Sequence, residues 1–280
     1  MTDSIPALGI ESISVFAMPP VEYVELVAAL GLEYIGFCPR PMTPNPHDYP
    51  AWSLGDDAAL RRATVAALAA NGVKVAAADG LFLLPGKDVS AIAGDLDALA
   101  EIGAPLVNAV SFDRDMARNT DQFGQLAEMA AARGMRAAVE FVPSLGVGDL
   151  ATALTLVRAV GRADFGVTID PMHLFRSGGT VADAAAVPAN EIAHIQVCDV
   201  PLVPIIENYG RESLDARFAP GEGELPLDAL FAVLPRMPVI GIEIPQLALA
   251  EAGMGPCARL APVVAASRAL LERVARQAGA

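Results

Sequence analysis

The chain has few cysteines and a shortage of positive charge, and each shortage excludes a class of protein. Its 19 lysines and arginines against 33 acidic residues give a net charge of −14, which repels phosphate backbones and anionic membranes and so argues against a nucleic-acid or membrane partner. The cysteines are odd in number and have no CxxC spacing, which argues against a disulfide framework or a thiolate zinc site. They are Cys38, Cys198 and Cys257.

Two further absences concern targeting and nucleotide binding. The first residues, Met1 to Ile5, show no basic segment followed by an apolar one, and no apolar run reaches membrane-spanning length, so a cytoplasmic location is predicted. No glycine-rich phosphate loop follows the first expected strand, which disfavours a doubly wound nucleotide-binding sheet.

What the chain does contain is a regular alternation of alanine-rich helical segments with short valine and isoleucine runs. No linker rich in proline, glycine or serine divides its 280 residues. The pattern predicts an α/β fold, a single (β/α)8 TIM barrel spanning residues 1–280. Strands are expected over 8–14, 33–37, 73–78, 106–110, 135–141, 167–169, 192–196 and 239–243, and helices over 21–30, 56–70, 89–102, 122–133, 150–160, 180–189 and 260–275.

The segment from Cys38 to Leu54 contains five prolines and is predicted to be a long ordered loop. In a barrel such a loop lies at the carboxyl-terminal face, where it helps to form the active site. Arg40, His47 and Trp52 in this loop are possible substrate contacts, although Trp52 could equally cover the helices.

Oxygen-bearing side chains stand at the ends of four successive strands in the second half of the chain. The clearest case is Asp170, where a β-branched run is stopped by Pro171. Because the ends of parallel strands meet at one face, these side chains are expected to converge. The four are Glu140, Asp170, Gln196 and Glu243.

Three carboxylates and an amide oxygen at one point would repel one another without a counter-ion. A divalent cation resolves the repulsion, and a set of oxygen donors favours Mg²⁺ or Mn²⁺ over Zn²⁺ or Cu²⁺. The alternative is that these residues cap turns and pair with arginines. Asp79, beside the third strand, either enters the site or only caps a turn.

Over essentially its whole length the chain resembles the sugar isomerase/epimerase superfamily with the xylose isomerase-like barrel. In that superfamily the metal is held by a Glu, by the Asp of an Asp-x-x-His turn, by a His three residues before an Asp, and by a Glu on the last strand. Glu140, Asp170 with His173, and Glu243 match this pattern.

The third ligand departs from the pattern, because the residue three positions before Asp199 is Gln196. The same substitution resembles that of the bacterial 3-dehydroshikimate dehydratases. Gln196 is therefore expected to be the ligand, and His194 is expected to point inward one layer deeper as a hydrogen-bonded interior residue.

The run from Arg217 to Leu227 resembles the Pro-Gly-x-Gly segment of the tagatose and psicose 3-epimerases, in which the arginine contacts substrate oxygens. This implies that Arg217 binds substrate in a polar loop, and the alternative is a surface arginine beside an ordinary turn. A guanidinium offers paired donors to hydroxyl or carboxylate oxygens, and Gly221 and Gly223 permit a tight turn.

The resemblance implies a metal-dependent isomerase or epimerase that removes a proton next to the metal-chelated carbonyl of a polyhydroxylated ketone. Glu140 and Glu243 would act as ligands and as base and acid, with His173 catalytic and in contact with substrate. The alternatives are a lyase of the 3-dehydroshikimate dehydratase type and, less favoured, a non-catalytic binding barrel. Endonuclease IV shares the barrel, but three histidines are too few for its trinuclear zinc site. Homo-oligomerisation is left open.

Overall fold

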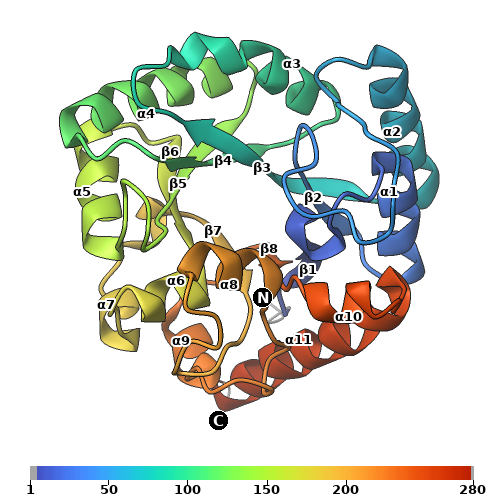
Figure 1. The fold of residues 1–280 in the computed structure, drawn as a ribbon. Helices are drawn as coiled ribbons and strands as arrows, with labels where there is room; N and C mark the ends of the chain where they lie inside the picture. The colour runs from blue at the N-terminus through green and yellow to red at the C-terminus, as the bar shows by residue number, and fades with distance from the viewer. Residues whose placement is uncertain (1–4, 279–280) are drawn as a thin grey trace.

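Eight parallel strands form a closed barrel enclosed by helices (Figure 1), as the alternating sequence pattern predicts. The computed structural model describes residues 5–278. The strands follow one another around the barrel in chain order, and β8 pairs with β1 to close it. Their bounds are β1 Ala7–Ile10, β2 Tyr34–Phe37, β3 Lys74–Leu83, β4 Leu106–Ser111, β5 Arg136–Glu140, β6 Phe165–Ile169, β7 Ile192–Val197 and β8 Val239–Ile242.

The first strand ends earlier than the sequence predicts. It stops at Ile10, and residues 12–15 form a short 3-10 helix, η1 (Ser12–Val15). The Ser14 hydroxyl donates to the carbonyl of Ile242 at 3.0 Å and accepts from the N–H of Ile244 at 2.8 Å. This side chain therefore ties the segment after β1 to the segment at the end of β8, where strand pairing has stopped.

The third strand runs further than predicted, through Asp79 and Gly80 to Leu83. Its register against β4 shifts between Ala78 and Leu81, and Gly80 has a positive φ of 80°. The glycine therefore marks a bulge in the strand rather than its end.

The longer helices begin and end at local capping signals. Asp57, Asp115 and Asp149 accept backbone N–H groups at the starts of α2, α4 and α5, and left-handed Gly72 and Gly161 end α2 and α5. The helix expected from residue 122 therefore begins at 116, directly after Asp115. The long helices are α1 Pro20–Ala29, α2 Ala58–Asn71, α3 Ala93–Glu101, α4 Met116–Ala131, α5 Leu150–Val160 and α11 Pro256–Ala278.

The remaining helices are short, and the periodicity of the sequence did not predict most of them. They are η2 Val89–Ile92, α6 Pro171–Arg176, α7 Val181–Ala185, η3 Ala189–Glu191, α8 Tyr209–Asp215, α9 Leu227–Val233 and α10 Leu247–Glu251. Within residues 5–278, no helix is both long enough and apolar enough to cross a membrane.

The barrel interior is layered by strand alternation. Asp79, Asn108 and Glu140 each lie two residues beyond a small or aliphatic side chain, namely Ala77, Leu106 and Ala138, which are buried and form one cluster. Because residues i and i+2 share a face, a polar layer rests directly on an apolar one. The strands therefore place polar and charged groups at the carboxyl-terminal end of the barrel, above a deeper apolar layer.

Outside this layer, helix α11 carries a buried positive charge. Arg259 of α11 is only 1 % exposed, and its guanidinium lies 4.9 Å from the centre of the Phe16 ring. None of its three side-chain nitrogens has a hydrogen-bond partner in the described part of the chain. Burial lowers the pKa of this guanidinium to about 10. An unpaired buried cation costs stability that a ring contact offsets only in part.

We therefore expect Arg259→Met to raise the melting temperature by about 2 °C or more, because methionine keeps the packing on Phe16 without the buried charge. Thermal unfolding followed by circular dichroism measures this. Arg268→Met, an exposed position of the same helix, is the matched control and should change the melting temperature little. A clear fall for Arg259→Met would show that the guanidinium is stabilising.

Candidate functional site

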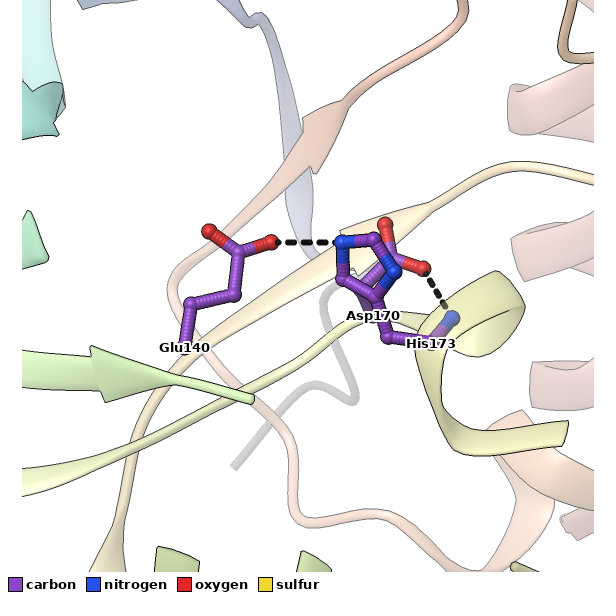
Figure 2. A group of neighbouring side chains, drawn as sticks. All are labelled: Glu140, Asp170 and His173. Atoms are coloured by element: carbon purple, nitrogen blue, oxygen red, sulfur yellow. Dashed lines mark hydrogen bonds and ion pairs between the residues drawn. The ribbon is translucent and has the colours of Figure 1, made fainter. Parts of the chain in front are cut away.

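The centre of the site is the turn that follows β6. Asp170 accepts the backbone N–H of His173 at 2.9 Å and caps α6, with Pro171 in the first helical position. The Asp-x-x-His spacing is thus one capped helical turn that directs His173 back toward the barrel. Its Nε2 lies 3.3 Å from Oε1 of Glu140, the last residue of β5 (Figure 2). The donor atoms of Glu140, Asp170 and His173 all lie within 4.8 Å of one another.

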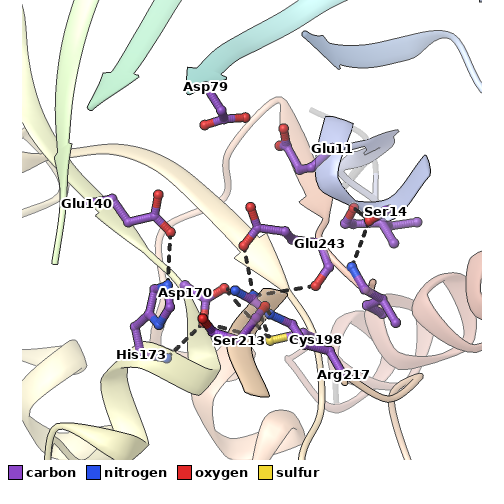
Figure 3. A network of polar contacts seen from close by, with 12 residues as sticks. Glu11, Ser14, Asp79, Glu140, Asp170, His173, Cys198, Ser213, Arg217 and Glu243 are labelled. Atoms are coloured by element: carbon purple, nitrogen blue, oxygen red, sulfur yellow. Dashed lines mark hydrogen bonds and ion pairs between the residues drawn. The ribbon is translucent and has the colours of Figure 1, made fainter. Parts of the chain in front are cut away.

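Arg217 is buried beside this turn and bridges two of the predicted metal ligands. Its Nη1 lies 2.5 Å from Oδ2 of Asp170 and 2.8 Å from Oε2 of Glu243 (Figure 3). The side chain is 2 % exposed, so the expectation of an arginine in a solvated polar loop, and the surface alternative, are both wrong about its environment. The segment around Arg217 therefore directs the guanidinium into the barrel.

Asp199 holds the loop that carries Arg217. Its carboxylate accepts the N–H groups of Gly221 at 2.9 Å and Leu225 at 3.1 Å, and its backbone pairs with Phe218. A Cβ at Gly223 would lie 2.3 Å from Oδ1 of Asp199, so only glycine fits there. Asp199, the acidic residue three positions after Gln196, thus holds the Pro-Gly-x-Gly turn in place through hydrogen bonds.

The positive charge of Arg217 acts unequally on the two carboxyl groups it contacts. Burial alone would raise the pKa of Asp170, but the charges of Arg217 and His173 outweigh it and lower that pKa to about 2. For Glu243, burial raises the pKa well above its usual range, and the neighbouring Glu140 and Asp170 add to this despite Arg217. Arg217 is thus shared between the two carboxyl groups, and the pKa of Glu243 stays raised despite this contact.

Gln196 on β7 is fully buried, and neither its amide oxygen nor its amide nitrogen has a hydrogen-bond partner among the described residues. A buried amide without hydrogen-bond partners lowers the stability of the fold, and a bound ligand or ion would remove this penalty. Its free oxygen is consistent with the ligand role expected from the sequence.

A second polar network lies on the opposite side of the barrel. His194 Nε2 and Glu11 Oε1 are hydrogen-bonded at 2.8 Å, which agrees with the interior role predicted for His194. Asp79 enters the barrel, where it accepts from Asn108 at 3.0 Å, and the same amide donates to Glu140 at 2.7 Å. Of the two alternatives left open by the sequence, Asp79 therefore enters the site and forms part of its floor.

The carboxyl groups of Glu11 and Asp79 lie close together at this end of the barrel (Figure 3). Glu11 Oε2 and Asp79 Oδ2 have no hydrogen-bond partner among the described residues. Burial raises the pKa of Glu11 to about 7 and that of Asp79 well above its ordinary range. Glycine at 36 and 241 makes room, since a Cβ at either position would lie within 2.0 Å of the Glu11 carboxylate.

Sequence reasoning missed three residues of this site. Tyr209 contacts Nδ1 of His173 through a short hydrogen bond, and Asn108 and Glu11 complete the floor. Asn108 could have been found as a polar residue inside an apolar strand, and Glu11 as a charge directly after one. Tyr209 is the first residue of the short helix α8, which follows an irregular segment, and it has no comparable signal.

The three candidates in the proline-rich loop do not reach the cavity at the barrel mouth. Arg40 pairs with Asp95 on α3 at 2.6 Å, and the Trp52 indole donates to the carbonyl of Ala17 at 2.9 Å. Trp52 packs against the core, which is the covering role that the sequence left open. His47 lies near Tyr49 and Arg259, outside the cavity lining.

A closed parallel barrel with its acidic cluster at the carboxyl-terminal end defines a TIM-barrel site. More specifically, the chain belongs to the xylose isomerase-like TIM barrel family, whose model matches residues 24–260. In overall shape it is similar to a zinc-binding IolI protein, with a TM-score of 0.78 and 18 % identity, covering 96 % of this chain and 99 % of that one. It is also similar to a D-psicose 3-epimerase, with a TM-score of 0.71 and 15 % identity, covering 95 % and 99 %.

Two curated proteins resemble the sequence over part of its length. An inosose isomerase of Halalkalibacterium halodurans is 28 % identical over 112 residues, which is 39 % of this chain and 38 % of that protein. A 3-dehydroshikimate dehydratase of Pseudomonas aeruginosa is 29 % identical over 154 residues, 52 % of this chain and 24 % of that protein. The matches thus span less than half the length of either relative. These relatives support an enzyme of this superfamily.

The raised pKa of Glu11 predicts a pH-dependent stability. Folding raises the pKa of Glu11 from 4.5 to about 7, so the folded state binds the proton more tightly and loses stability as the pH rises between these values. Glu11→Gln keeps the shape and removes the titration. Its gain in unfolding free energy over the parent should be larger at pH 8 than at pH 4.5 by on the order of 3 kcal/mol, at about 1.36 kcal/mol per pKa unit.

Urea unfolding at the two pH values measures this difference. Glu25→Gln, on the exposed face of α1, removes the same charge at the surface and is the control for net charge. A pH-independent difference between Glu11→Gln and the parent would contradict a proton held at this position.

Proposed function

We propose that this chain is a divalent-metal-dependent isomerase or epimerase of a polyhydroxylated ketone, acting by removal of a proton next to the carbonyl. The observation that carries the proposal is the convergence of Glu140, Asp170 and His173 within 4.8 Å. The buried amide of Gln196 on β7, which has no hydrogen-bond partner among the described residues, supports it. Glu243 faces this group from the end of β8 (Figure 3).

The residues fit a divalent cation with a preference for oxygen donors. Glu140, Asp170, Gln196 and Glu243 would hold it, and Mn²⁺ or Mg²⁺ suits this donor set best. Of each of these two carboxylates Arg217 contacts one oxygen, Oδ2 of Asp170 and Oε2 of Glu243, so each carboxylate keeps a second oxygen. When bound, the ion would supply Lewis-acid stabilisation of the negative charge that develops on the substrate oxygen.

The protein's own groups supply the proton transfer. Glu140 and Glu243 lie on either side of the Asp170 turn (Figure 3), so one can take a proton from one face of a substrate carbon while the other delivers a proton to the opposite face. Their exchange of roles would allow the reaction to run in both directions.

His173 is fixed at both ring nitrogens by its neighbours. Nδ1 is hydrogen-bonded to the Tyr209 hydroxyl, and Nε2 lies 3.3 Å from Oε1 of Glu140. From this position His173 can orient the Glu140 carboxylate and donate to a substrate oxygen, while Arg217 offers its remaining donors to the same cavity.

The second candidate is a lyase of the 3-dehydroshikimate dehydratase type. Two observations favour it: the partial similarity to a protein of that name, and glutamine in place of histidine at position 196. The same residues would form the enolate, but a β-hydroxyl would then leave as water. Release of water with a new absorbing enone, in place of an epimerised product, identifies this alternative.

The chemistry is tested in D₂O with D-fructose, an inosose and 3-dehydroshikimate as candidate substrates, with protein stripped by EDTA and then reloaded with Mn²⁺. We expect C–H cleavage, seen by NMR as deuterium incorporation or as a primary isotope effect, only after reloading. Glu140→Gln and Glu243→Gln should each slow it by about 100-fold or more. Full turnover after exhaustive chelation would contradict the proposal.

The donor type at position 196 is tested separately. Gln196→His exchanges an amide oxygen for an imidazole nitrogen, which should shift the preferred ion from Mn²⁺ or Mg²⁺ toward Zn²⁺ or Co²⁺. Elemental analysis after equilibration with equal concentrations of the ions gives the preference without an activity measurement. An unchanged preference would remove Gln196 from the ligand set.

A further inference from the structure

The cavity above the proposed catalytic residues has a buried polar floor and a largely apolar wall. It has a volume of about 450 Å³. Its floor is formed by Asp79, Asn108, Glu140, His173, Arg217 and Glu243, which are all buried. The wall nearer the mouth is largely apolar and draws on η1, the loop after β2, the ends of β3 and β4, the loop after β5, and α8. Its members include Ile13, Met42, Phe82, Phe112, Leu145 and Leu214.

Two aromatic rings dominate this wall and are only half covered. Phe82 is 43 % exposed and Phe112 is 44 % exposed, and their centroids are 5.9 Å apart in an edge-to-face arrangement. Leu214 on α8, also in the lining, is 39 % exposed. Large apolar side chains gathered and left open around a cavity indicate a surface that an apolar ligand covers.

The position of the rings is set by rigid backbone. Phe82 pairs in register with Val110 of β4, just beyond the Gly80 bulge, and the N–H of Phe112 donates to the carbonyl of Leu83 at 2.9 Å. The bulge re-aims this end of β3, because an extra residue shifts its register. The aromatic pair is therefore part of the barrel rim rather than of a loose loop.

Three of the polar residues near the mouth make hydrogen bonds at or within α8. Asn208 Oδ1 accepts the N–H of Arg211, Arg211 Nε donates to Asp215, and the Ser213 hydroxyl donates to the carbonyl of Gly210. The apolar side chains beside them offer no partner to the hydroxyl groups of a fully hydroxylated ligand. An apolar ring would instead bury itself against Phe82 and Phe112 without leaving polar groups unpaired.

We propose that the substrate is a hydroxy-ketone whose hydroxylated head, bound at the polar floor, carries an aromatic or alicyclic apolar group, and that Phe82 and Phe112 select this group. The inference rests on the proposed function for the head and adds the chemistry of the remainder. It assigns Phe82 and Phe112 as specificity-determining residues at the carboxyl-terminal ends of β3 and β4.

The test uses two probes with the same head, hydroxyacetone and 2-hydroxyacetophenone, which differ in a methyl against a phenyl group. Their dissociation constants from the Mn²⁺-loaded protein are measured by isothermal titration calorimetry. The phenyl ketone should bind at least about ten-fold tighter, because its ring is transferred from water to the aromatic wall. Phe82→Ala and Phe112→Ala should each reduce this ratio to about three-fold or less.

Val65→Ala on the outer helix α2 is the matched control, since Val65 is 40 % exposed but lies outside the cavity lining. It should leave the ratio unchanged. Equal affinities of the two ketones, or a ten-fold ratio that survives both phenylalanine substitutions, would overturn the inference.

The same samples separate this inference from the function on which it rests. Metal-dependent C–H exchange of both ketones in D₂O, without a preference for the phenyl ketone, would leave the proposed function standing and reject the apolar subsite. If a correctly folded, metal-loaded protein binds neither ketone, recognition of the head fails, and the inference fails with it.

Discussion

The constraint on which the rest of this structure depends is the amount of negative charge gathered inside one end of the barrel. Glu11, Asp79, Glu140, Asp170 and Glu243 are all nearly buried, and Arg217 is the guanidinium placed among them. Carboxylates at such distances cannot all be ionised in a dry interior. The arrangement is stable only if some hold protons, some pair with the arginine, and the remainder are compensated by a cation.

Each of these solutions is visible in a different part of the barrel. Glu11 occupies the space that Gly36 and Gly241 leave open, and burial raises the pKa of its carboxyl group to about 7, which favours a bound proton. Asp170 forms an ion pair with Arg217. Asn108 donates one hydrogen bond to Asp79 and one to Glu140, and so links these two residues. What stays uncompensated is the region between Glu140, Gln196 and Glu243, and this is the region proposed to hold the metal. Removing Arg217 would therefore disturb both the fold and the chemistry, since it would leave two buried carboxyl groups without their counter-charge.

Strand alternation made much of the site predictable. A parallel strand with a polar residue at its carboxyl end has to present that residue at the shared face, so Glu140 and Asp170 could be placed together from their spacing alone. His194 is buried and hydrogen-bonded to Glu11, in agreement with the interior role predicted for it. The roles of these residues as ligands, base and acid remain proposals, because they depend on a cation and a substrate.

Irregular features escaped the same reasoning. The early end of β1, the bulge at Gly80 and the helix that carries Tyr209 depend on where neighbouring strands and loops meet, which no local periodicity contains. Arg40 and Trp52 were plausible substrate contacts by composition, but Asp95 and the carbonyl of Ala17 engage them elsewhere.

The sequence by itself determined the barrel, its order of strands, the capping of its longer helices and the convergence of carboxylates, because these follow from period-two and helical patterns and from short-range turn chemistry. Only the tertiary structure decided that Arg217 is buried between Asp170 and Glu243, that Glu11 lies close to Asp79, and that Phe82 and Phe112 stand exposed above a polar floor. These pairings join residues from distant strands, and their charges, solvation and exposure exist only once the barrel closes.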